Sequence, residues 1–418
     1  MNIIHKFLQI SSANPAFTAC IFKGQVISRG LFYQLTCKVA LELHQRGIGP
    51  GDVVGVSMDH SPMHLATLLA LARLGAITLP VHPSTAAPVK TRLMARYGAK
   101  RLICNSNALD LSGIEKISLD EVQVDASSKL DMGFIEYWPA PTAPARIGLT
   151  SGTTGQAGAI LYTQAYWLDR ISKYADTCDE QSRMMPSDLH LTMGSLCALG
   201  AVFAGGVVVF VQLNDMQAYA KAINLHAVTH AFMPPAMVKG LAAILPYDGV
   251  AFPTIRDLKF IGSGLSAHLI ELASRKLTPH IYLPYGISEI GRVSPATPEL
   301  LASHPDYAGR LDDRINLEGL KFYPEQVESV LNAHPELKEA AVFVIEGQDK
   351  SQILMAVIVA KNPPPLDLKM ADFCLQKKLG RMTPQRYVLV RELPRNPTGK
   401  IMRSALPALI RPPKEVQH

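Results

Sequence analysis

The first part of the chain alternates between apolar runs and stretches with helical spacing. Residues 31–46 carry apolar side chains at the period of an amphipathic helix and end at Gly47, where a helix is expected to stop. The apolar run 53–57 predicts a short buried strand, followed by a helix over 64–74 and a strand over 76–81. This strand–helix–strand order predicts βαβ units and a parallel sheet with both faces covered.

The alternation resumes after residue 162 and changes scale after residue 308. Further strands are predicted at residues 227–232, 258–261 and 281–283, with a helix at 235–245. Beyond Gly309 the pattern predicts a helix over 324–333 and strands over 340–345 and 353–359. We therefore expect an α/β protein in two parts, a large N-terminal domain (1–308) of parallel βαβ layers and a small C-terminal α+β domain (309–418).

One uncharged segment, residues 191–213, is long enough to cross a bilayer. Ala204-Gly205-Gly206 divides it, and the β-branched run that follows reads as a strand. A buried helix, a glycine turn and a buried strand fit this pattern better than a transmembrane helix, so we expect no stable membrane insertion.

Composition supports a folded protein without a nucleic-acid partner. The hydrophobic fraction is 48%, the charged fraction 18% and the formal net charge +6, and no run of Lys or Arg resembles a nucleic-acid-binding arm. The six cysteines are scattered without metal-ligand spacing, as in reduced cytosolic proteins. With no secretory signal at the N-terminus, we expect a cytoplasmic location. The sequence does not indicate an oligomeric state.

A short segment combines glycines and hydroxyls between two apolar runs. It reads Thr150-Ser151-Gly152-Thr153-Thr154-Gly155. Glycines let the backbone approach a ligand, and successive N–H groups form an anion nest to which hydroxyls add donors. A flexible linker is the alternative, although linkers seldom have apolar runs directly on both sides. The segment lacks the Gly-Lys-Ser/Thr of the P-loop and the glycine fingerprint of a nucleotide-binding dehydrogenase.

Three more motifs follow along the chain. They read Tyr285-Gly286-Ile287-Ser288-Glu289, Gly309-Arg310-Leu311-Asp312-Asp313-Arg314-Ile315 and Pro394-Arg395-Asn396-Pro397-Thr398-Gly399-Lys400-Ile401-Met402-Arg403. With the hydroxyl-rich loop, they resemble the motifs of the adenylate-forming (AMP-binding) superfamily, in that family's order. This superfamily contains acyl-CoA synthetases, aryl-CoA ligases, luciferases and nonribosomal adenylation domains.

The resemblance implies an ATP site. It assigns the phosphates to the loop of Thr150, Ser151, Gly152, Thr153, Thr154 and Gly155, with Thr153 also counted as catalytic. It places Tyr285 and Gly286 by the adenine and Ser288 by the α-phosphate. Glu289 would hold Mg²⁺, a hard cation that needs oxygen ligands and neutralises charge as pyrophosphate leaves.

The resemblance also implies a moving catalytic lysine. Arg310 would contact the ribose, and Asp312 would be the hinge about which the small, mobile C-terminal domain turns. Lys400 would bridge the substrate carboxylate and the α-phosphate, where a compact ammonium offsets the charge that builds on phosphorus.

The acyl pocket is assigned to His190 and to Gly262, Ser263 and Gly264, again by resemblance. A histidine before an apolar run is also often a packed or capping residue, so both interpretations of His190 stay open. Other candidate lining residues, Met193 and Tyr282, offer no charge for an amino group, which favours an aryl or medium-chain acid over an amino acid.

The sequence departs from the family in two places. Ala157-Gly158-Ala159 replaces the usual Pro-Lys-Gly end of the phosphate loop, which removes one cation near the pyrophosphate. The segment 290–308 is a shortened form of a whole subdomain that normally includes a ribose-binding aspartate, and Asp306 is our candidate for that role.

The activity implied is ATP-dependent adenylation of a small carboxylic acid and transfer of the acyl group to a thiol. Coenzyme A is the first candidate for that thiol, and the phosphopantetheine of an acyl or peptidyl carrier protein acting in trans is the second. A catalytically inactive scaffold that retains the fold is a third possibility, favoured by the two departures. Retention of Thr153, Glu289, Arg310 and Lys400 together argues against it.

Overall fold

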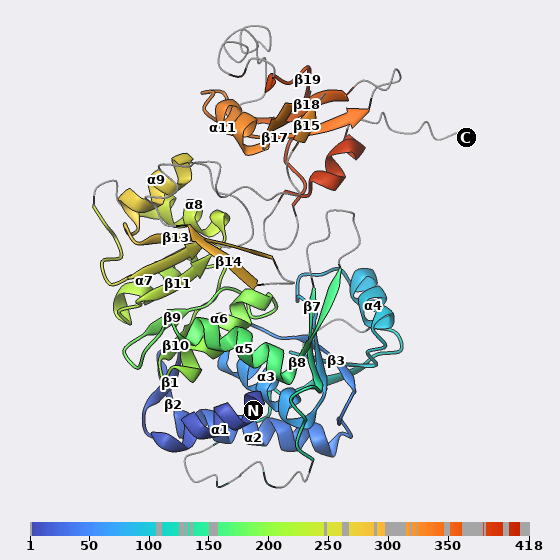
Figure 1. Ribbon diagram of the computed structural model, residues 1–418, viewed down its shortest axis with the longest axis vertical. Helices are drawn as coiled ribbons and strands as arrows, with labels where there is room; N and C mark the ends of the chain where they lie inside the picture. Colours follow the sequence, from blue (N-terminus) through green and yellow to red (C-terminus); the bar gives the residue numbers. More distant parts are fainter. Residues whose placement is uncertain are drawn as a thin grey trace. The chain divides into compact units, whose positions relative to one another are not determined.

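The computed structural model describes most of the N-terminal part of the chain and the core of the C-terminal part (Figure 1). The described residues are 2–105, 111–124, 129, 133, 137–149, 158–245, 249–260, 267–287, 291–296, 315–317, 320–322, 324–346, 352–361, 379, 382–395 and 401–409. The chain divides into two compact units, the first built mainly from residues 1–295 and the second mainly from 296–418.

Two mainly parallel sheets form the first unit. The six-stranded sheet has the order β6 (Glu115–Ser118), β5 (Arg101–Cys104), β3 (Val53–Ser57), β4 (Ile77–Pro80), β7 (Pro144–Leu149) and β8 (Ala159–Thr163). The eight-stranded sheet has the order β14 (Gly291–Ala296), β13 (Ile281–Ile287), β12 (Asp257–Phe260), β11 (His230–Met233), β9 (Arg183–Met185), β10 (Val207–Phe210), β1 (Thr18–Phe22) and β2 (Gln25–Ser28). In these two sheets, β7–β8 and β1–β2 are the antiparallel pairs among the pairings described.

Nine helices of the first unit connect or cover these strands in the described residues. They are α1 (Ile3–Ala13), α2 (Arg29–Gln45), α3 (Pro62–Leu74), α4 (Ala87–Arg96), α5 (Gln164–Ala175), α6 (Thr192–Phe203), α7 (Met216–Leu225), α8 (Pro235–Ile244) and α9 (Ala267–Lys276). The largest apolar cluster joins side chains of α1, α2, α3, α5 and α6 to β1, β9 and β10, and Figure 1 shows α3, α5 and α6 between the two sheets.

The uncharged segment 191–213 folds as its glycines predict. It forms α6, a turn in which Gly205 has φ +82°, and the fully buried strand β10. A helix that is apolar on every side is a core helix when sheets cover it, and most of α6 is buried. Within the described part of the chain, no helix is long and apolar enough to cross a membrane.

The second unit is a small α+β fold. Strands β17 (Leu337–Glu346), β18 (Gln352–Ala360) and β19 (Arg386–Leu389) form one sheet, and β15 (Ile315–Leu317) and β16 (Leu320–Phe322) form a hairpin. Alternate side chains of β17 and β18 pack on helix α11 (Pro324–Asn332) on one face. The others pack with Leu393 and with Leu406 of the 3₁₀ helix Arg403–Leu409 on the opposite face.

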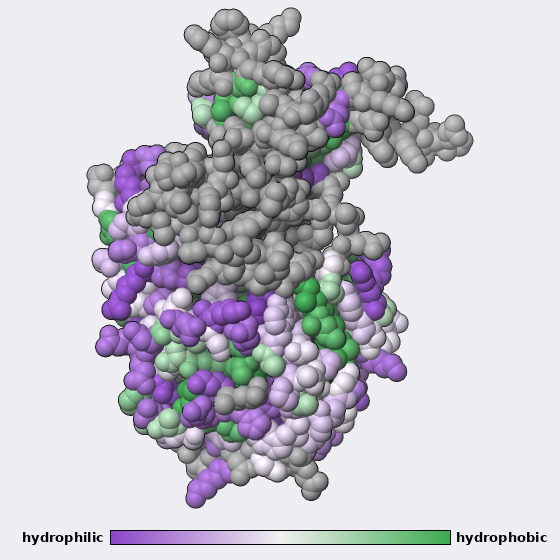
Figure 2. All heavy atoms as spheres, viewed as in Figure 1, coloured by the Kyte–Doolittle hydropathy of each residue, from purple (hydrophilic) through white to green (hydrophobic). Residues whose placement is uncertain are grey.

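The α/β class and the division into a large and a small part are confirmed, and most predicted boundaries lie within two residues of the observed ones. The strand predicted from residue 227 begins only at His230, because Ala227 has φ +46° in a turn. On the face shown in Figure 2, apolar side chains form separate patches among polar ones, as on most folded proteins.

Candidate active site

Polar side chains gather at the carboxyl ends of parallel strands in both sheets of the first unit. His60 follows β3 and His82 follows β4 in the six-stranded sheet, while Asp188 and His190 follow β9 in the eight-stranded sheet. In open parallel sheets, ligands bind at the carboxyl ends of the strands. These ends therefore mark the candidate active site.

The hydroxyl-rich loop begins at the same edge. Strand β7 runs parallel to β4 and pairs antiparallel with β8, with Leu149 opposite Ala159. The loop therefore starts and ends on two paired strands, next to the strand that leads to His82. The residues predicted to bind the phosphates, Thr150, Ser151, Gly152, Thr153, Thr154 and Gly155, lie outside the described residues.

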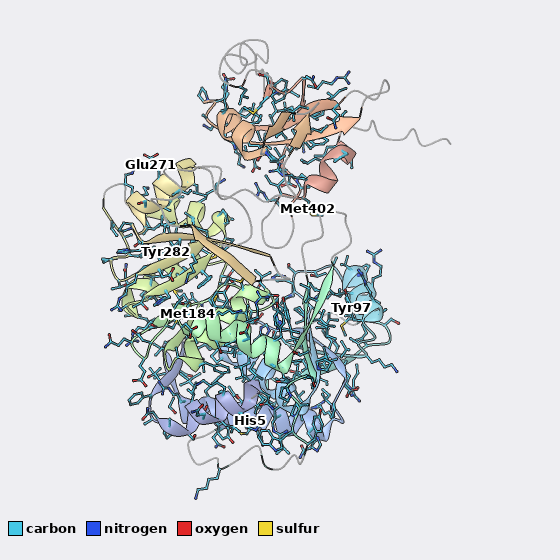
Figure 3. All side chains as sticks on the ribbon, viewed as in Figure 1. His5, Tyr97, Met184, Glu271, Tyr282 and Met402 are labelled. Atoms are coloured by element: carbon cyan, nitrogen blue, oxygen red, sulfur yellow. The ribbon has the colours of Figure 1, made fainter. Side chains whose placement is uncertain are left out.

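Two more predicted segments begin at strand ends or inside a strand. Strand β12 ends at Phe260, directly before the segment that holds Gly262, Ser263 and Gly264, which lies outside the described residues. Strand β13 is longer than predicted and contains Tyr285 and Gly286, and Tyr282 lies near its start (Figure 3). Ser288, Glu289, Asp306, Arg310 and Asp312 also lie outside the described residues.

The loop of Lys400 has both of its ends held by backbone pairing. Lys400 itself lies outside the described residues, but Arg395 and Ile401 form an antiparallel bridge. The N–H of Met402 donates to the carbonyl of Pro394 at 2.8 Å, and Figure 3 labels Met402 beside the 3₁₀ helix. The segment 396–400 therefore begins and ends at two residues, Arg395 and Ile401, that are paired with each other.

The last residue of this motif, Arg403, ties the loop to the core of the second unit. Its guanidinium donates to both carboxylate oxygens of Glu328 on α11, and its Nη1 also donates to the carbonyl of Val342 on β17 at 3.1 Å. Glu328 Oε1 accepts the Val342 N–H at 2.8 Å. The motif alone gives no role to Arg403. In the structure, Arg403 connects the end of the loop to α11 and β17.

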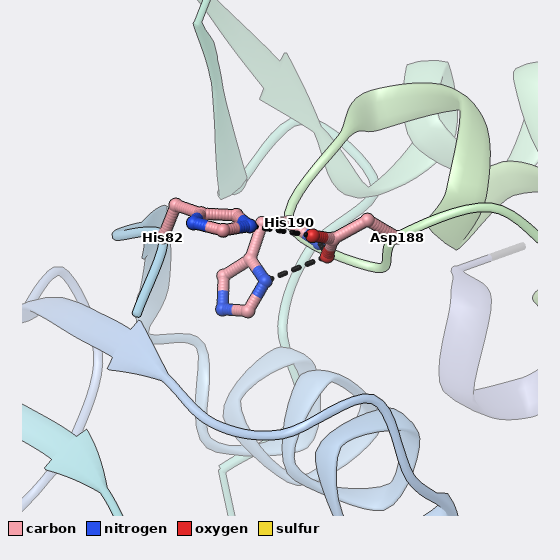
Figure 4. Close-up of side chains that lie close together, drawn as sticks. All are labelled: His82, Asp188 and His190. Atoms are coloured by element: carbon pink, nitrogen blue, oxygen red, sulfur yellow. Dashed lines mark hydrogen bonds and ion pairs between the residues drawn. The ribbon is translucent and has the colours of Figure 1, made fainter. Parts of the chain in front are cut away.

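The side chain of His190, the histidine assigned to the acyl pocket, lies in the described part of the chain and is buried. Its Nδ1 lies 2.7 Å from Asp188 Oδ1, and its backbone N–H donates to the same oxygen at 2.8 Å. The second oxygen of Asp188 lies 2.8 Å from Nε2 of His82 (Figure 4). His190 is therefore packed and hydrogen-bonded at the strand-end edge.

His64 and Arg146 also lie next to His190. The ring of His64, at the start of α3, lies 4.6 Å from that of His190 between centroids. Arg146 of β7 is fully buried and donates from Nη2 to the carbonyls of Leu189 and His190, each at 3.2 Å. The motifs do not include His60, His64, His82, Asp188 or Arg146. The available signal is that His60 and His82 follow the strands predicted at 53–57 and 76–81.

Burial controls the protonation of this cluster. It lowers the pKa of His60 to about 4, and it lowers the pKa of His64 and of His190 despite the nearby Asp188 carboxylate. Burial alone would raise the pKa of Asp188, but hydrogen bonds from His190 and His82 outweigh it and hold that pKa well below its usual range. At neutral pH the imidazoles of His60, His64 and His190 are therefore neutral, whereas the Asp188 carboxylate is ionised.

These pKa shifts predict that acid weakens the fold. The unfolded chain takes up protons on its histidines near pH 6.5, whereas folded His60 takes one up only near pH 4, so the free energy of unfolding falls as the pH drops below about 6.5. By pH 5, His60 alone should cost about 1–2 kcal/mol. Asp188 stays ionised over this range. Urea unfolding at pH 7 and pH 5 should show the loss, reduced in His60→Gln and unchanged in the exposed control His44→Gln.

The loop of Asp188 and His190 depends on Gly194. A Cβ there would lie 2.0 Å from the Asp188 carbonyl oxygen and 2.5 Å from that of Ser187. Because backbone atoms cannot swing away, we expect Gly194→Ala to lower the free energy of unfolding by about 1–3 kcal/mol. Urea midpoints measure this, with Gly49→Ala as the control, since a Cβ at Gly49 meets no atom within 4 Å. Equal midpoints for the two variants would contradict the assigned packing.

Comparison with known proteins agrees with this architecture. Residues 8–313 match the family described as AMP-binding enzyme, and residues 326–400 match the AMP-binding enzyme C-terminal domain. The chain belongs to the AMP-binding enzyme family. Its mixed α/β fold, with a large N-terminal domain and a small C-terminal domain, is that of adenylate-forming enzymes.

Individual relatives are distant but cover the chain. A 4-chlorobenzoate–CoA ligase of Arthrobacter sp is 22% identical, with 88% of this chain and 87% of that protein aligned. A fatty acid–[acyl-carrier-protein] ligase, ScoC of Streptomyces coeruleorubidus, is 22% identical over 94% of this chain and 93% of its own length. The solved o-succinylbenzoate CoA synthetase (MenE) of Bacillus subtilis, in complex with its acyl-adenylate intermediate, has a TM-score of 0.81 at 18% identity and covers 96% of this chain and 97% of its own.

Proposed function

We propose that this protein adenylates a small carboxylic acid with ATP and then passes the acyl group to a thiol. The strongest structural support is where three strands end. Strand β7 ends at the predicted phosphate loop, β12 ends before the predicted acyl-pocket segment 262–264, and β13 contains the start of the Tyr285 motif. All three motifs therefore leave the sheets on the side where parallel strands place ligands. Family membership and CoA-ligase and carrier-protein-ligase relatives support acid activation by adenylation.

In the first half-reaction, a carboxylate oxygen of the acid attacks the α-phosphorus of ATP. The new P–O bond forms as the bond to pyrophosphate breaks, which gives an acyl-adenylate. The residues around 150–155 would hold the phosphates through backbone N–H groups and hydroxyls, and Lys400 would neutralise charge on the α-phosphate and the carboxylate. Mg²⁺, held by Glu289, would neutralise the departing pyrophosphate.

In the second half-reaction, a thiol attacks the acyl carbonyl, and AMP leaves. We propose that the second unit turns about Asp312, which withdraws Lys400 and admits the thiol. Coenzyme A is the favoured acceptor, because the 4-chlorobenzoate relative is a CoA ligase. The relative that acts on an acyl carrier protein supports the phosphopantetheine arm of a carrier protein as the second candidate.

The acid is proposed to be aryl or medium-chain. Met193 and Tyr282 are partly buried, and neither they nor the glycines and Ser263 supply a charge that would pair with an amino group. The named substrates of two relatives, 4-chlorobenzoate and o-succinylbenzoate, are aryl acids. His190 fits a wall of this pocket as a rigid neutral imidazole, since Asp188 fixes its ring.

Two departures from the family define the competing function. The loop lysine missing at Gly158 and the short segment 290–308, with Asp306 as the candidate ribose ligand, would suit a scaffold that binds without turnover. The backbone pairing at both ends of the Lys400 loop favours an enzyme, because a scaffold that only binds does not need a positioned lysine.

The test is acid-dependent release of pyrophosphate. The purified chain is mixed with ATP, Mg²⁺ and a panel of aryl, fatty and amino acids, and pyrophosphate is measured with and without coenzyme A. Release that depends on one acid class supports the proposal and identifies the substrate. No release with any acid, together with no thermal shift on adding ATP, would leave the scaffold as the better explanation.

A further inference from the structure

A carboxylate and two histidines converge at the strand-end edge of the first unit. His82 Nε2 and His190 Nδ1 each approach one of the two oxygens of Asp188, at 2.8 and 2.7 Å (Figure 4). One ligand atom from each of the three residues lies within 4.8 Å of the others, and no other such group of His, Cys, Asp or Glu occurs in the part of the chain that the structure describes.

The hydrogen bonds among these three residues leave two nearby imidazole nitrogens without a partner. Nε2 of His190 and Nδ1 of His64 are buried and have no hydrogen-bond partner. The two residues are 8% and 1% exposed, and their rings are neighbours at 4.6 Å. A buried polar atom without a hydrogen-bond partner is unfavourable, so these two nitrogens call for an explanation.

A metal ion would change the tautomers of both ligand histidines. If Nδ1 of His190 gave its lone pair to a metal, the ring proton would move to Nε2, the buried nitrogen that has no hydrogen-bond partner. If Nε2 of His82 bound the same ion, its Nδ1–H would face Ser84 Oγ, now 2.7 Å away. Metal-bound histidines usually donate their other N–H in this way. The Ser84 N–H, which lies 3.1 Å from Nδ1, would lose its hydrogen bond.

We propose that His82, Asp188 and His190 form a binding site for one divalent transition-metal ion of the zinc class. Two imidazoles and one carboxylate are ligands that Zn²⁺ and Co²⁺ accept, and three protein ligands leave a coordination position open for water or another ligand. Its three ligands do not include Glu289, the proposed Mg²⁺ ligand, and the inference does not depend on the proposed function.

The charges around the site set its strength. Asp188 supplies one negative charge, and Arg146 places a buried positive charge against the backbone of His190. This arrangement favours weaker, exchangeable binding over the tight binding of a structural zinc site with several thiolates.

The experiment titrates the full-length chain with Co²⁺ and with Zn²⁺, without ATP or acid, after removal of metals with a chelator. The visible spectrum of Co²⁺ reports imidazole coordination, and calorimetry with Zn²⁺ gives the affinity. We expect one ion per chain, and an affinity at least about 10-fold weaker in His82→Ala and in Asp188→Asn. The exposed His44→Ala and the Mg²⁺-site variant Glu289→Gln should bind as the native chain does.

Circular dichroism and thermal unfolding establish which variants are folded. His82 is only partly buried, so His82→Ala decides the outcome if Asp188→Asn does not fold. The inference is overturned if the native chain binds neither ion, or if the folded His82→Ala variant binds both with native affinity. Loss of binding in Glu289→Gln would also overturn it by moving the ion to the ATP site.

Discussion

Replacing Lys400 with alanine is expected to slow formation of the acyl-adenylate about 100- to 1000-fold, with little change in the free energy of unfolding. Removal of one charge-stabilising donor from a phosphate- or oxyanion-binding site costs this much in rate. The loop should stay folded, because the Arg395–Ile401 bridge and the Met402–Pro394 hydrogen bond hold its ends. Single-turnover quenching with ATP and the acid measures the adenylate directly.

The control is Lys338→Ala, which removes an exposed lysine from β17 in the same unit. It should adenylate at the native rate. Transfer of the acyl group from a supplied acyl-adenylate should be much less affected by Lys400→Ala, because the proposed second half-reaction withdraws this lysine. If Lys400→Ala forms the acyl-adenylate at the native rate, Lys400 does not take part in adenylation.

Arg403→Ala is expected to destabilise the second unit by about 3 kcal/mol. The substitution leaves the buried carboxylate of Glu328 with the Val342 N–H as its remaining described partner, and breaking a buried ion pair by removing one partner costs about 3–5 kcal/mol. Arg403 is partly exposed, which places the effect at the lower end. Hydrogen exchange in the full-length chain should show faster exchange in β17 and β18.

Exchange in the first unit should be unchanged, since the described contacts of Arg403 lie within the second unit. The matched control is Arg391→Ala, an exposed arginine of the same unit. Adenylation should also decrease in Arg403→Ala, because the loop of Lys400 loses its anchor. Protection in β17 equal to that of the control would show that the ion pair contributes nothing to stability.

The sequence predicts the architecture well where hydrophobic periodicity is strong. The boundaries of β3, α3 and α8 follow from apolar runs ended by Gly or begun by Pro. The glycines inside the uncharged segment correctly predict the boundary between α6 and β10. Ala227 has a positive φ that no residue preference predicts, so the start of β11 is displaced.

The site is predicted less completely, for a physical reason. Motifs identify residues that are adjacent in sequence. Asp188 and His82 are far apart in sequence and come together because β9 and β4, which lie in different sheets, end close to each other. The burial that lowers the pKa of His64 and His190 likewise comes from packing between distant elements. The role of Arg403 depends on its distance from Glu328, which spacing along the chain does not give.

The most direct test of the central claim follows an oxygen atom. A substrate acid labelled with oxygen-18 in its carboxylate is incubated with ATP, Mg²⁺, the enzyme and coenzyme A, and the AMP formed is analysed by mass spectrometry. Adenylation predicts that AMP carries one oxygen-18, because the carboxylate oxygen that attacks the α-phosphorus remains on AMP when the thiol displaces it. Unlabelled AMP, or label found in inorganic phosphate, would contradict the account.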